Sequence, residues 1–116
     1  MSRALLLAAL LAGTASAQAA EPTGHYLVEG SNPGGGGGYS GSVDVTRTGA
    51  TYRVVWTIGG QRFIGTAIGS PQAFAVSYRS GNETGLAIYT EDGNDWSGAW
   101  TYAGGNQLGT EHWLRK

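Results

Sequence analysis

Residues 39–66 read YSGSVDVTRTGATYRVVWTIGGQRFIGT, and this stretch decides the fold. Large apolar residues alternate with polar ones, and the pattern is interrupted by Gly49-Ala50 and by Gly59-Gly60. Side chains alternate between the two faces of a strand, so a two-residue turn at each point would align apolar faces. The expected pairs are Val45 with Val54, Val43 with Trp56, Trp56 with Phe63 and Val54 with Gly65. A shift of one residue would destroy every match, so the stretch predicts two successive hairpins.

The back half of the chain shows a similar alternation. Phe74, Val76 and Tyr78 share one strand face. A three-residue connection at Glu91-Asp92-Gly93 would place Ile88 opposite Trp96 and Leu86 opposite Gly98. An opening strand at residues 26–29 and a closing strand at residues 108–114 bring the total to about eight. We therefore predict an all-β fold, a small eight-stranded antiparallel up-and-down barrel, because closure removes exposed strand edges. A flattened β-sandwich is the alternative.

The last hairpin allows two registers. If Gly104-Gly105 forms a two-residue turn, Trp96 faces Trp113, Trp100 faces Gly109 and Glu111 points inward opposite Gly98. A buried carboxylate is costly unless it is paired, and it is then a candidate site. If a bulge intervenes, Leu108, Thr110 and His112 point inward instead. We favour the arrangement that leaves Glu111 at the rim or on the surface.

The interior of the predicted barrel also allows two interpretations. Gly41, Gly65 and Gly98 are expected to face inward. They either open a pocket for a small ligand or leave room for the rings of Trp56, Trp96 and Trp100. Eight-stranded barrels are just wide enough for either outcome, and we favour the filled core. The candidate ligand-binding residues are Trp56, Trp96, Trp100, Glu111 and Trp113.

The start of the chain resembles a secretory signal peptide. Arg3 supplies the positive region, Ala4 to Ala12 a short apolar run, and Ala17-Gln18-Ala19 a cleavage signature. We expect a signal peptide at residues 1–19, a single β-barrel domain at residues 20–116, and a secreted or periplasmic protein. The apolar run is too short for a membrane anchor, so no integral membrane association is expected. The sequence has no cysteine, so the domain must fold without disulfides.

Charge and motifs exclude several function classes. With Arg3 removed, six basic and eight acidic residues remain, which argues against nucleic acid or an anionic membrane as a partner. The glycine-rich loop at residues 34–38 lacks the ending of a phosphate-binding loop. His25 and His112 are too few for a metal site. Ser97, His112 and Asp95 lack the context of a catalytic triad, so we expect no enzyme, no metal and no cofactor.

A resemblance to a known family covers nearly the whole mature chain. The segments that carry it are residues 28–36, 39–41, 52–56, 58–60, 76–87, 100–105 and 109–111. Together they resemble a family of small exported alphaproteobacterial proteins that are often labelled "fibronectin-binding protein". The resemblance implies an exported binding protein and supplies no catalytic residues. Bacterial fibronectin adhesins usually add extended repeats to a host sheet, and no such repeat is present here.

Three function classes remain from the sequence. The first is an exported, non-enzymatic binding protein that contacts an extracellular-matrix-type protein, such as fibronectin, through exposed loops. The second is a carrier of a small hydrophobic ligand, similar to avidin or lipocalin barrels. The third is an exported inhibitor of a protease or lysozyme. A cavity lined by Trp56, Trp96 and Trp100 would favour the carrier, and a filled core would favour surface recognition.

Overall fold

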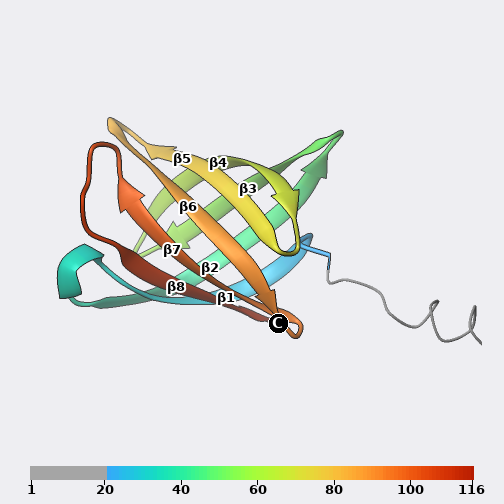
Figure 1. The fold of residues 1–116 in the computed structure, drawn as a ribbon, viewed down its shortest axis with the longest axis horizontal. Coiled ribbons are helices and arrows are strands. Elements are labelled where there is room, and N and C mark those ends of the chain that lie inside the picture. The colour runs from blue at the N-terminus through green and yellow to red at the C-terminus, as the bar shows by residue number, and fades with distance from the viewer. Residues whose placement is uncertain (1–20) are drawn as a thin grey trace, which may run out of the picture.

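The structure is a computed structural model that describes residues 21–116, so the expected signal peptide lies outside the described residues. Eight antiparallel strands follow one another around a closed barrel, and β1 pairs with β8 to complete it (Figure 1). This confirms the predicted barrel. The strands are β1 (Gly24–Ser31), β2 (Gly38–Thr48), β3 (Thr51–Ile58), β4 (Gln61–Ser70), β5 (Ala73–Ser80), β6 (Glu83–Asp92), β7 (Asp95–Tyr102) and β8 (Gly109–Arg115). A short 3-10 turn, η1 (Pro33–Gly35), lies between β1 and β2.

The first two hairpins have the predicted register. Val45 pairs with Val54, and Trp56 pairs with Phe63. The turns leave Gly49 at φ +70° and Gly59 at φ +57°, a left-handed conformation that glycine adopts without steric cost. The central inward side chains of the two strands are buried, as the alternation required: Val43 and Val45 of β2, and Tyr52, Val54 and Trp56 of β3.

The predicted pairing of β6 with β7 is wrong. The turn contains two residues, Gly93 and Asn94, so Asp92 pairs with Asp95 and Tyr89 pairs with Gly98. Leu86 and Ile88 therefore face outward and are 58% and 53% exposed. The prediction failed because β6 carries apolar residues on both faces. Its inward face consists of Gly85, Ala87 and Tyr89, and the first two are small.

The two ends of the barrel differ. At the end that holds both Glu21 and the last strand residue, Arg115, aromatic rings fill the interior. Phe74 packs against Trp96 at 5.7 Å and against Tyr52 at 5.1 Å between ring centroids. Arg115 stacks over the Tyr26 ring and donates hydrogen bonds to the Tyr26 hydroxyl (2.7 Å) and the Glu21 carbonyl (2.8 Å). This end is closed by packing.

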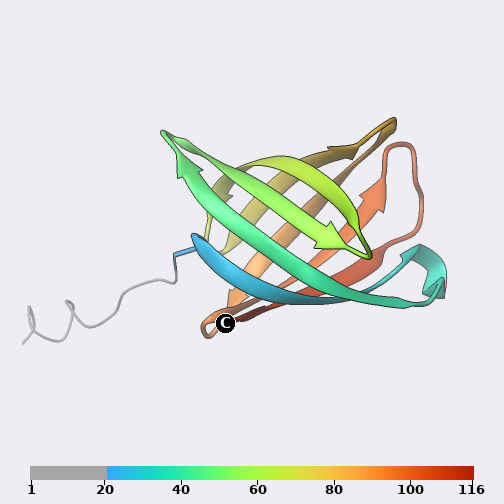
Figure 2. The same ribbon diagram turned by 180° about the vertical axis from the view of Figure 1, so that it is seen from behind.

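The opposite end carries the two longest connections, residues 32–37 and residues 103–108. They lie side by side in both views (Figures 1 and 2), and a Cβ atom at Gly34 would touch the side chain of Gln107. The tight β3–β4 and β5–β6 turns lie at the same end. The β1–β2 connection is closed by a hydrogen bond from the Asn32 amide to the Gly37 carbonyl (2.9 Å). The interior beneath these loops is not filled.

Candidate ligand-binding site

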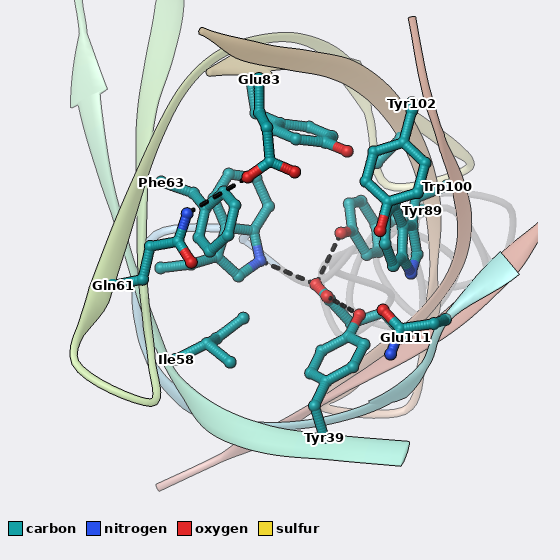
Figure 3. A pocket seen from close by; sticks show the side chains of 13 residues that line it. Tyr39, Ile58, Gln61, Phe63, Glu83, Tyr89, Trp100, Tyr102 and Glu111 are labelled. Carbon is teal, nitrogen blue, oxygen red and sulfur yellow. Dashed lines mark hydrogen bonds between the residues drawn. The ribbon is translucent and has the colours of Figure 1, made fainter. Parts of the chain in front are cut away.

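A cavity of about 250 Å³ lies inside the loop-bearing end of the barrel (Figure 3). Seven aromatic side chains line it: Tyr39, Trp56, Phe63, Tyr78, Tyr89, Trp100 and Tyr102. Ile58 and Ala87 add aliphatic surface, and Asn32 and Gln61 add neutral polar groups. Glu83 and Glu111 are the charged residues of the lining, which contains no lysine, arginine or histidine. The favoured expectation of a filled core is therefore wrong at this end of the barrel.

Glu111 points inward and is only 4% exposed. It lies opposite Gly98, and Trp96 lies opposite Trp113, as the two-residue turn required. The favoured surface or rim position is therefore wrong. The loop at residues 103–108 is longer than a two-residue turn, but β7 and β8 pair in the register that the two-residue turn predicts. No bulge therefore reverses the faces of β8. The reason for the inward position is the set of hydrogen bonds that the carboxylate receives.

Four donors converge on the Glu111 carboxylate. Oε1 accepts hydrogen bonds from Trp56 Nε1 (2.7 Å), the Tyr89 hydroxyl (2.7 Å) and Trp113 Nε1 (2.8 Å). Oε2 accepts one from the Tyr39 hydroxyl (2.6 Å). Figure 3 shows three of these bonds meeting at the carboxylate. Each oxygen of an ionised carboxylate has two lone pairs. Three donors share those of Oε1, whereas Oε2 accepts one hydrogen bond and keeps one acceptor position that the described residues do not use.

No described cation neutralises Glu111. The two ion pairs within residues 21–116 are His25 with Asp44 and Arg47 with Glu21, both away from the cavity. A buried charge is costly unless hydrogen bonds or a counter-charge compensate it. Within the part of the chain that the structure describes, hydrogen bonds alone compensate this one.

The negative charge acts on the neighbouring tyrosines. Burial raises the pKa of Tyr39 and of Tyr89 well above the ordinary value, and the Glu111 charge raises both further. Burial, followed by the Tyr102, Glu83 and Glu111 charges, raises the pKa of Tyr78 to about 12. These hydroxyls are therefore neutral near pH 7, and those of Tyr39 and Tyr89 donate to the carboxylate.

Inward glycines make room for the rings that reach the carboxylate. A Cβ atom on Gly98 would lie 2.3 Å from Cδ2 of Tyr89 and 2.5 Å from the Ile88 carbonyl oxygen. Tyr39 lies across Gly30 in the same way, on the neighbouring strand. In each pair the tyrosine ring lies over a glycine, which has no side chain. The tyrosine hydroxyl can therefore reach the Glu111 carboxylate inside the barrel. Gly65 similarly admits the Trp56 ring, whereas Gly41 abuts the Thr57 backbone.

The structure separates the five predicted site residues. Trp56, Trp100 and Glu111 line the cavity. Trp113 lies outside the lining but donates to Glu111. Trp96 is fully buried at the closed end against Phe74 and does not reach the site. The sequence reasoning missed Tyr39 and Tyr89 as carboxylate partners. Their position opposite Gly30 and Gly98 is the signal that could have identified them.

The residues considered for catalysis do not form a site. Ser97 Oγ lies 3.0 Å from His112 Nδ1, but both residues face away from the barrel interior on neighbouring strands. Asp95 accepts a hydrogen bond from the Arg115 amide instead of orienting His112. Within residues 21–116, no cluster of three His, Cys, Asp or Glu residues has metal-binding geometry.

Comparison with protein-family models and with curated protein sequences yields no match. Within residues 21–116, no helix is long and apolar enough to cross a membrane. Because fold alone does not specify function, the functional argument depends on the cavity and its chemistry.

Proposed function

We propose that this protein is an exported, non-enzymatic binding protein that holds a small molecule in the cavity at the loop-bearing end of the barrel. The observation that carries the proposal is the cavity itself, walled by aromatic side chains around one hydrogen-bonded carboxylate. Small-molecule sites are typically concave and mostly apolar, with a few fixed polar groups that orient the ligand. An eight-stranded barrel of this kind has room for one small ligand.

The volume indicates how large a part of a ligand the cavity can hold. Liquid water occupies about 30 Å³ per molecule, so 250 Å³ corresponds to roughly eight waters, or a ligand of about ten non-hydrogen atoms. The aromatic lining favours a ligand with a flat or apolar body. Binding rather than turnover is favoured because four donors from the barrel, three on Oε1 and one on Oε2, already engage the Glu111 carboxylate.

Binding of a protein partner through the exposed loops, which the family resemblance implies, is a separate prediction. The loops at residues 32–37 and 103–108 lie at the end of the barrel that holds the cavity, and Asn32 belongs to the lining, so a protein partner and a small ligand would compete for the same end of the barrel. The cavity is the feature that specifically supports a small ligand.

A cavity-filling substitution tests the proposal. Ala87 lies on the cavity wall and is 5% exposed, so Ala87→Leu would occupy the space a ligand needs. Ala75→Leu, on the outer face of neighbouring β5, is the matched control. The three probes are phenethylamine, phenethyl alcohol and phenylacetate, measured by isothermal titration calorimetry. Native mass spectrometry of protein from its own culture looks for a retained small molecule.

We expect at least one probe to bind the parent and the Ala75→Leu variant and to lose binding in Ala87→Leu. Absence of binding by all three probes, together with no retained small molecule, would contradict the proposal. Equal binding by Ala87→Leu would also contradict it, because the ligand would then lie outside the cavity.

A further inference from the structure

The charge and the hydrogen-bonding groups of the cavity identify the class of its ligand. We infer that the cavity binds a small organic cation, a protonated amine or a quaternary ammonium group carried on an apolar body. This inference depends on the proposed function, since it concerns the occupant of the same cavity. It follows from three independent features: the sign of the charge, the hydrogen-bonding groups already in use, and the aromatic wall.

The charge of the lining is negative only. Glu111 lies at the inner end of the cavity and Glu83 on the opposite side near its mouth, with both carboxylates turned toward the space between them (Figure 3). Glu83 is held there by a hydrogen bond from Gln61 Nε2 (3.3 Å). The described part of the chain contributes no basic side chain to the lining, so an anionic ligand would face two carboxylates without a counter-charge from these residues. A cation would supply the counter-charge that buried Glu111 lacks.

Most hydrogen-bond donors of the lining already have acceptors inside the barrel. The Tyr39 and Tyr89 hydroxyls and the Trp56 indole donate to Glu111. The Tyr78 hydroxyl donates to the Thr101 carbonyl (3.3 Å). Among the described residues, the Trp100 indole N–H has no acceptor; the acceptors that the site offers a ligand are the remaining position on Glu111 Oε2 and the oxygens of Glu83. A ligand that donates, as an ammonium group does, matches these acceptors.

Aromatic rings form a continuous wall around the same space. Phe63 contacts Tyr78 at 6.0 Å, Tyr78 contacts Trp100 at 6.3 Å, and Trp100 contacts Tyr39 at 6.1 Å, all close to edge-to-face. Cages of aromatic rings bind ammonium groups through the negative potential of the ring faces. The cation–π contacts that the described residues do make involve Arg47 and Arg115, at the other end of the barrel. Among residues 21–116, no cationic side chain belongs to the wall of the cavity.

A series of ligands that differ only in charge tests the inference. Phenethylamine, phenethyl alcohol and phenylacetate have the same ring and nearly the same length but carry a positive, zero and negative charge. Choline and its uncharged carbon isostere, 3,3-dimethylbutan-1-ol, form a second pair. We expect each cation to bind about tenfold or more tightly than its neutral counterpart, and phenylacetate not to bind. Affinity for the cations should fall as the salt concentration rises.

Two substitutions connect the preference to the carboxylates. Glu83→Gln removes a charge at the exposed mouth of the cavity. We expect it to weaken the binding of phenethylamine about fivefold and to leave the binding of phenethyl alcohol unchanged. Glu29→Gln makes the same change of charge on the outer face of β1 and should not change the affinity for either ligand. Glu111→Gln should abolish most of the preference. If that variant fails to fold, the Glu83 comparison and the ligand series still decide the outcome.

The results distinguish the two proposals. If phenethyl alcohol binds in the cavity as tightly as phenethylamine, the protein is a small-molecule binder but the inferred charge of its ligand is wrong. If phenylacetate binds best, the inference is likewise overturned. If no probe binds and the protein retains no small molecule from its culture, the proposed function fails and the inference fails with it.

Discussion

Replacing Glu111 by leucine should destabilise the barrel severely, although leucine is similar in size. The substitution removes the acceptor for three buried donors: Trp56 Nε1, the Tyr89 hydroxyl and Trp113 Nε1. An unsatisfied buried donor costs about 1–3 kcal/mol. Three donors therefore predict a loss of roughly 3–9 kcal/mol, and water entering from the adjacent cavity should keep the loss near the lower end. The Tyr39 hydroxyl borders the cavity and adds little.

Glutamine at the same position separates hydrogen-bond acceptance from charge. Its amide oxygen can occupy the place of Oε1 and accept the same three donors. Hydrogen bonds to a neutral acceptor are weaker than those to a carboxylate by about 1 kcal/mol each, and removal of a buried charge offsets part of this loss. Glu111→Gln should therefore cost less than about 2 kcal/mol in the free energy of unfolding.

Urea unfolding measures both variants, followed by tryptophan fluorescence and circular dichroism and extrapolated linearly to water. Glu29→Leu on the outer face of β1 is the control and should lie within about 0.5 kcal/mol of the parent. The reasoning is refuted if Glu111→Leu is as stable as the parent. Equal losses in the leucine and glutamine variants would show that charge, and not acceptance of hydrogen bonds, holds the donors together.

Two further predictions concern the residues around Glu111. Gly98→Ala should lower the free energy of unfolding in urea by about 2–4 kcal/mol, because the new Cβ would meet both the Tyr89 ring and the Ile88 carbonyl, and the backbone cannot easily move aside. An unchanged unfolding midpoint would show that Tyr89 need not lie over Gly98. Alkali should unfold the barrel, since the pKa values of Tyr39, Tyr78 and Tyr89 are raised in the folded state. The stability from these neutral tyrosines is complete below the ordinary tyrosine pKa of 10.0 and is lost as pH rises toward the pKa values of the folded state, about 12 for Tyr78. Phenolate absorbance should therefore appear together with the loss of circular dichroism. Ionisation of all tyrosines near pH 10 in an intact barrel would contradict this.

The hairpins of the front half could be predicted because a glycine marked each turn, Gly49 and Gly59, and the large apolar residues of β2 and β3 lie mainly on one face. The β6–β7 hairpin lacked the second condition. Leu86 and Ile88 are apolar yet face solvent, while Ala87 and Tyr89 face inward. A two-residue periodicity does not show which of two apolar faces points into the barrel. The orientation of β6 depends on its packing against β5 and β7. The prediction of a barrel was correct despite this error, because the number and order of the strands, and not one local register, determine closure.

The site was harder to predict than the fold. The sequence placed Glu111 inward in one of two registers, but the factor that decides between them is spread over four strands. Tyr39 comes from β2, Trp56 from β3, Tyr89 from β6 and Trp113 from β8. Donors so far apart in the chain leave no local pattern. A buried carboxylate was judged costly in isolation, and the four hydrogen bonds that remove much of this cost become visible only in three dimensions.

The two oxygens of Glu111 divide its roles between the two halves of the barrel. Oε1 accepts a hydrogen bond from Trp113, whose ring packs on Tyr89 at 4.2 Å and on Tyr26 at 5.5 Å between ring centroids. Oε1 therefore anchors the aromatic layer at the closed end of the barrel. Oε2 faces the cavity with one acceptor position unused by the described residues. Changes at Glu111 must therefore affect stability and ligand preference together. Glu83 contributes charge to the same cavity but is exposed and anchors no buried ring, so it alone of the two carboxylates can alter ligand preference without altering stability.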